Sequence, residues 1–136
     1  MTINTEENWL IPGTVVKIYT YNTIPPKLKR CVIIGFVDSP NTVALVYFNS
    51  NPPSSPFVEP YQIEFSGSED FLEHHCYLDC AQLYEETEEW IKYEVANNEY
   101  SCILGRLSEI DFKKVMLTIK NAKTISIKTK KKYGIT

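Results

Sequence analysis

The chain has 136 residues and a formal net charge of −3, and 43% of its residues are hydrophobic and 12% aromatic. This length fits one domain over 1–136 and leaves little room for a second. The apolar content excludes an intrinsically disordered chain, and no apolar run approaches the ~18 residues that a membrane span needs. Residues 1–9 contain neither a basic n-region nor an apolar h-region, so we expect no signal peptide and a cytoplasmic protein.

The first half of the sequence predicts a three-stranded meander. Pro25 and Pro26 place the connection 22–29 in a loop, and the turn-forming residues at 38–41 predict a tight second connection. The second strand is almost continuously apolar, so we expect it to be central in the sheet. β-branched and aromatic residues define the three expected strands, which are 14–21, 30–37 and 42–48.

The second half of the sequence mixes strands and helices. Four prolines between 49 and 60 exclude a central strand there and predict a loop. The strongest helix prediction is 109–120, because Ser108 is a good N-cap and apolar residues recur with the period of a helix. The other expected elements are strands over 61–65 and 76–80, a helical turn over 69–73, a partly helical segment over 83–92 and a short strand over 124–127.

The four cysteines are expected to be reduced, since no secretion signal accompanies them; they are Cys31, Cys76, Cys80 and Cys102. The segment from His74 and His75 to Cys80 contains zinc-ligand residue types. On a strand, however, Cys76 and Cys80 would lie about 13 Å apart, too far for one tetrahedral ion. Two interpretations therefore stay open for the histidines, namely acid–base work near neutral pH and a polar lead-in to a buried strand.

Charge is distributed very unevenly along the chain. Between 69 and 111 there are twelve acidic and two basic residues, whereas residues 113–136 contain eight lysines and no acid. This split predicts a tail that faces a polyanion, and its alternative is a solvated helix face with a disordered end. We expect the basic tail over 128–136 to be dispensable for the core and to contact RNA phosphates through Lys128, Lys130, Lys131 and Lys132.

Four segments, taken in order, carry a resemblance to a known family. A turn opens the first strand at 11–19, a basic pair precedes an apolar strand at 29–35, the third strand ends at Ser50, and a Gly-x-Leu motif leads into the last helix at 105–112. Together they resemble the MazF/PemK ribonuclease toxins over roughly residues 10–120. The resemblance implies a mainly β fold with a C-terminal helix, built as a small SH3-like β-barrel.

The same resemblance implies a function and a site. The implied protein is a metal-independent endoribonuclease toxin of a type II toxin–antitoxin system, a homodimer without a cofactor whose partners are RNA and a cognate antitoxin. Arg30 would stabilise the charge that develops on the phosphate during attack by the 2′-hydroxyl, and Ser50 would donate a hydrogen bond to that phosphate. Asn49 and Lys29 would bind substrate.

Three departures from the family pattern support an alternative. Cys31 stands where the family carries proline, residues 23–29 replace its glycine-rich loop, and Ser50 replaces its usual threonine. The alternative is a catalytically degenerate SH3-like module that binds protein or RNA. In that case Arg30 is an ordinary exposed residue at a strand end, and residues 49–53 form a simple turn.

Overall fold

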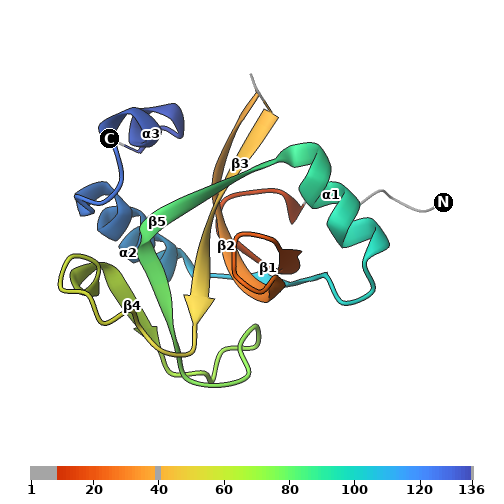
Figure 1. Ribbon diagram of the computed structural model, residues 1–136, viewed down its shortest axis with the longest axis horizontal. Coiled ribbons are helices and arrows are strands. Elements are labelled where there is room, and N and C mark those ends of the chain that lie inside the picture. The colour runs from red at the N-terminus through yellow and green to blue at the C-terminus, as the bar shows by residue number, and fades with distance from the viewer. Residues whose placement is uncertain (1–8, 39–40, 136) are drawn as a thin grey trace.

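The computed structural model describes residues 9–38 and 41–135, which form one curled antiparallel sheet and three helices (Figure 1). The sheet has six strands in the order β4-β5-β3-β2-β1-β6 and curls into a half-barrel. The strands are β1 (Thr14–Thr20), β2 (Lys27–Asp38), β3 (Asn41–Asn49), β4 (Gln62–Phe65), β5 (Cys76–Thr87) and β6 (Cys102–Arg106). The helices are α1 (Glu88–Asn97), α2 (Glu109–Asn121) and α3 (Ile127–Lys132).

Both faces of the sheet are covered, which explains the continuous apolar run of β2. One face packs against α2 through Val115 and Ile119, and the other packs against α1 through Ile91. Figure 1 shows α1 on one side of the sheet and α2 and α3 on the other. Consecutive residues of β2 point to opposite faces, so Val32 packs in the core on the α2 side and Ile33 in the core on the α1 side. Both are fully buried.

The mainly β fold, the β1–β3 meander and the central position of β2 are confirmed. The prediction of a loop over 22–29 is wrong at its end, because β2 begins at Lys27, directly after the two prolines. Lys27 pairs with Thr20, and the ladder continues from there along β1. The predicted turn at 38–41 includes residues 39–40, which lie outside the described residues.

The predicted helix over 109–120 is confirmed, and the Ser108 side chain accepts a hydrogen bond from the Asp111 amide at 3.0 Å. No helix in the described ranges is long and apolar enough to cross a membrane. The segment 83–92 is partly helical, as expected: β5 continues to Thr87, and α1 begins at Glu88. The Thr87 side chain caps α1 by accepting a hydrogen bond from the Trp90 amide. The strand β6 was not predicted.

The basic tail belongs to the fold, so the prediction that the core does not need it is wrong. Ile135 is only 4% exposed and joins the cluster under α2. The Tyr133 hydroxyl hydrogen-bonds to the Thr42 hydroxyl at 2.9 Å. The predicted strand over 124–127 is also wrong, because Ser126 caps α3 by accepting from the Thr129 amide at 3.1 Å.

Candidate functional site

A cleft of about 470 Å³ opens at the end of the sheet where β2 begins, β3 ends and β5 begins. Its polar lining comes from these strand ends and from the segment before β5: Lys27, Lys29, Arg30, Asn49, Ser50, Asn51, Glu73 and His74. Three cations therefore face one carboxylate in the cleft, although the whole chain carries a negative net charge. Apolar side chains complete the wall, so the cleft has the size and mixed lining of a small-ligand site.

The structure brings together four residues that the sequence singled out. Lys29 and Arg30 lie near the start of β2, and Asn49 and Ser50 lie where β3 ends. Antiparallel pairing of the two strands therefore places these ends side by side. The register aligns Cys31 with Tyr47, which puts the residues before Cys31 opposite those after Tyr47. The sheet topology itself assembles this end of the cleft.

Arg30 is held in place by two contacts from the segment before β5. Its Nε donates to the Phe71 carbonyl at 3.1 Å, and its terminal guanidinium nitrogen lies 2.9 Å from a carboxylate oxygen of Glu73. The Arg30 side chain is 22% exposed, whereas the Glu73 side chain is 72% exposed. Because Phe71 is buried in the core, the Nε contact fixes the guanidinium plane, while Glu73 can turn toward solvent.

Lys29 lies on the other side of the strand and still reaches the cleft. Consecutive strand residues point to opposite faces, and the cleft opens at the strand ends, where both faces meet. Lys29 Nζ donates to Asn49 Oδ1 at 2.6 Å and lies 6.0 Å from the centroid of the Tyr47 ring. Burial and the nearby Lys27 charge lower the pKa of Lys29, which makes its ammonium a better proton donor than an ordinary lysine.

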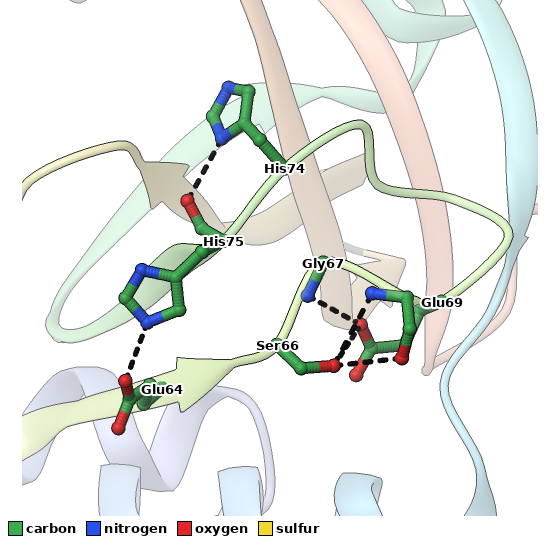
Figure 2. Close-up of polar contacts among 7 residues, drawn as sticks. Glu64, Ser66, Gly67, Glu69, His74 and His75 are labelled. Carbon is green, nitrogen blue, oxygen red and sulfur yellow. Dashed lines mark hydrogen bonds and ion pairs between the residues drawn. The ribbon is translucent and has the colours of Figure 1, made fainter.

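A tightly folded loop positions Glu73 and His74. Gly67 has a φ of +93°, and its amide donates to a Glu69 carboxylate oxygen at 3.0 Å (Figure 2). A Cβ on Gly67 would lie 2.3 Å from the His74 carbonyl carbon, so the two backbones touch here. Only glycine permits this close approach, and through it the Ser66–Glu69 turn supports the backbone of His74.

The two neighbouring histidines occupy different environments. The His74 Nδ1 lies 2.9 Å from the His75 carbonyl oxygen, and His74 lines the cleft. The His75 Nε2 lies 2.5 Å from a Glu64 carboxylate oxygen on β4, and Figure 2 shows its ring directed toward Glu64. The structure therefore separates two residues that the sequence treated as one pair.

Three of the four cysteines behave as packed apolar side chains. Cys31, Cys76 and Cys80 are all at most 2% exposed, Cys76 is among the residues that line the cleft, and Cys102 is partly buried. Burial raises the pKa of Cys76, and it raises the pKa of Cys80 to about 12, so neither is a ready thiolate. Within 9–38 and 41–135, no group of three or more His, Cys, Asp or Glu side chains could hold a metal ion.

The four tail lysines predicted to bind substrate lie on α3, away from the lining of the cleft. Lys130 Nζ donates to the carbonyls of Lys120 and Ala122 at 2.9 and 2.7 Å, which caps the end of α2. Lys132 pairs with Glu85 at 2.8 Å. Lys128 and Lys131 are exposed, so these two remain the better candidates for phosphate contacts on this helix.

No family model and no curated protein matches this chain. The cleft also contains Lys27 and Glu73, which the sequence does not single out, and His74, for which acid–base work is one of two interpretations. Glu73 and His74 follow the apolar pair at 71–72, which is buried and anchors the loop. That short apolar pair in a polar stretch is the sequence signal that could have indicated a fixed loop.

Proposed function

We propose that the protein is a metal-independent endoribonuclease that binds single-stranded RNA in the cleft at the end of β2, β3 and β5. The observation that carries the proposal is the meeting of Arg30, Lys29, Asn49 and Ser50 in one cleft. These are the residues for which the sequence resemblance implies catalysis and substrate binding. The curled β-sheet with its C-terminal helices is compatible with the SH3-like barrel that the resemblance implies.

The cleft has the groups that cleavage by the neighbouring 2′-hydroxyl requires. The 2′ oxygen bonds to phosphorus, the bond from phosphorus to the 5′ oxygen breaks, and the products are a cyclic phosphate and a 5′-hydroxyl. Arg30 is oriented by the Phe71 carbonyl, so its guanidinium can stabilise the charge that grows on the phosphoryl oxygens. Ser50 donates a hydrogen bond to the same group, and Lys29 adds positive charge.

Single-stranded RNA fits this chemistry better than a duplex or DNA. The reaction consumes the 2′-hydroxyl, which DNA lacks. A small cleft at a sheet end can accept a splayed nucleotide, whereas the backbone of a duplex cannot bend into it. The uneven charge of the chain supports binding at this place, because the cleft gathers cations on an otherwise acidic protein.

The proposed biological role follows from the sequence resemblance. We propose a cytoplasmic toxin of a type II toxin–antitoxin system, which forms a homodimer and is held inactive by a cognate antitoxin. Expression of the wild-type chain should arrest growth of its host, and expression of Arg30→Ala should not. Growth at equal protein levels in both cultures would contradict the toxin role.

One observation favours a second function, a non-catalytic module that binds RNA or protein. The Arg30 guanidinium already has a carboxylate partner in Glu73, which occupies the place that a phosphate would take. A module of this kind would bind RNA in the cleft and release it uncut. Cleavage is therefore the property that separates the two functions.

The decisive experiment incubates purified protein with single-stranded and base-paired RNA in the presence of EDTA. We expect cleavage of the single strand only, with unchanged rate in EDTA and loss of activity in Arg30→Ala. Because Arg30 lies at a strand end and is partly exposed, its truncation should leave the fold intact by circular dichroism. Activity that disappears in EDTA and returns with magnesium or zinc would refute the metal-independent mechanism.

A further inference from the structure

We propose that His74 is the general base of this site and takes the proton from the attacking 2′-hydroxyl. This inference rests on the proposed endoribonuclease function and assigns a catalytic residue that neither Arg30 nor Ser50 can replace. A guanidinium stays protonated in proteins, and a neutral serine hydroxyl is a poor proton acceptor. His74 supplies the imidazole among the side chains that line the cleft, and imidazole is the side chain that most often serves as a general base.

The hydrogen bond of His74 fixes which ring nitrogen carries the proton. Its Nδ1 lies 2.9 Å from the His75 carbonyl oxygen, and a carbonyl can only accept, so Nδ1–H donates. In the neutral ring the proton is therefore on Nδ1, and Nε2 presents its lone pair. A base must present a lone pair to the proton that it abstracts, and this tautomer provides one.

The loop that carries His74 is supported from both sides. Phe71 and Leu72 are buried just before it, and Cys76 is buried just after it. Gly67 presses against the His74 backbone from the Ser66–Glu69 turn (Figure 2). An exposed side chain on such a fixed backbone can hold a position without losing access to substrate.

The charged groups that face His74 are those of the cleft. Lys27, Lys29 and Arg30 of β2 line the cleft with it, Glu73 precedes it in the chain, and Cys76 follows on β5. The end of β3 contributes only uncharged side chains. The Arg30 guanidinium that would hold the phosphate and the His74 ring that would take the proton therefore line the same cleft.

The proposed step balances as a proton transfer coupled to transesterification. His74 Nε2 takes the proton of the 2′-hydroxyl as the new oxygen–phosphorus bond forms. The bond to the 5′ oxygen breaks, and that oxygen takes a proton from the Lys29 ammonium. Proton exchange with solvent then returns His74 to the neutral form and Lys29 to the charged form, and the step to the cyclic phosphate consumes no water molecule.

The test compares His74→Gln with His75→Gln in the full chain. Both residues are exposed and adjacent, so His75→Gln controls for loop damage. The readouts are single-turnover cleavage of a single-stranded RNA between pH 5 and 9, and binding of the same sequence with 2′-O-methyl riboses. We expect His74→Gln to slow cleavage by about 10² to 10⁴-fold with unchanged binding, because that is the usual contribution of a general base.

The pH profile separates a base from a merely structural residue. The wild-type rate should fall on the acid side, where the imidazole becomes protonated, and this fall should vanish in His74→Gln but persist in His75→Gln. If His74→Gln kept the wild-type cleavage rate and the fall in rate on the acid side, the role of His74 as a base would be refuted. The proposed endoribonuclease function would still stand. No cleavage by the wild-type chain, with RNA still bound, would overturn both and indicate the binding module.

Discussion

Removing the Glu73 charge should tighten RNA binding. The carboxylate pairs with the Arg30 guanidinium at 2.9 Å, so under the proposed function it competes with the substrate phosphate for that group. Glu73→Gln keeps the size of the side chain and removes its charge. The Phe71 carbonyl still orients Arg30 through Nε, so the guanidinium stays in position for the incoming phosphate.

The size of the effect follows from two terms. Breaking an exposed ion pair costs about 0.2 to 1 kcal/mol, and the Glu73 side chain is 72% exposed. A phosphate about 6 Å from the displaced carboxylate is repelled by about 0.7 kcal/mol in water and by about 3 kcal/mol at the effective dielectric of a protein surface. Exposure favours the lower value, so the sum is about 1 to 2 kcal/mol, or roughly 5- to 30-fold in Kd.

The assay is fluorescence anisotropy with a labelled 2′-O-methyl RNA that cannot be cleaved. Asp70→Asn is the matched control, because it removes the same charge from an exposed residue of the same loop that does not line the cleft. The gain in Glu73→Gln should shrink at high salt, since exposed charges are screened. An equal gain in Asp70→Asn, or no gain in Glu73→Gln, would refute the competition between Glu73 and phosphate.

Three further predictions concern the loop, the core and α3. Gly67→Ala should lower the thermal midpoint and slow cleavage, since its Cβ would lie 2.3 Å from the His74 carbonyl carbon; thermal unfolding followed by circular dichroism and single-turnover rates check the two effects. Ile135→Ala should cost about 2 to 5 kcal/mol of unfolding free energy in urea titration, as for other buried isoleucines. The Lys128→Ala/Lys131→Ala double variant should unfold like the wild type but flatten the log–log salt dependence of RNA binding by about 1.4, at roughly 0.7 per phosphate.

The parts of the fold that local chemistry determines were predictable. Ser108 caps α2 as expected, because its side chain can satisfy the free amides of the first turn. The apolar run of β2 indicated a central strand, and the structure covers both of its faces. In each case the signal lies within one segment and needs no knowledge of what packs against it.

The elements that depend on distant partners were missed. β6 pairs with β1, but its sequence shows no alternation of apolar and polar residues. Its apolar Ile103 is exposed, as is Arg106. Ile135 is a single apolar residue after a short lysine-rich helix, and one residue cannot establish a period. Its burial becomes visible only when α3 is placed against the sheet.

The residues of the candidate site also fall into those that the sequence indicated and those that depend on contacts across the fold. The resemblance of their segments to a known family singled out Arg30 and Ser50, and antiparallel pairing brings these two strand ends together. Glu73 escaped notice because its importance comes from a contact with Arg30 across the fold. The roles of His74 and His75 could not be separated from sequence, since the distinction rests on the Glu64 carboxylate of β4, which pairs with only one of them.

Under the proposed function, local charge matters more than net charge for RNA binding. The net charge of −3 opposes binding of a polyanion, yet Lys27, Lys29 and Arg30 gather in one cleft. Three cations at roughly 0.7 per phosphate give a salt dependence with a log–log slope of at most about 2. A steeper measured slope therefore requires a second basic surface. The exposed Lys128 and Lys131 of α3 are the candidates for that surface. A slope near 2 that those two lysines do not change would confine RNA to the cleft, where Glu73 is then the main charge opposing it.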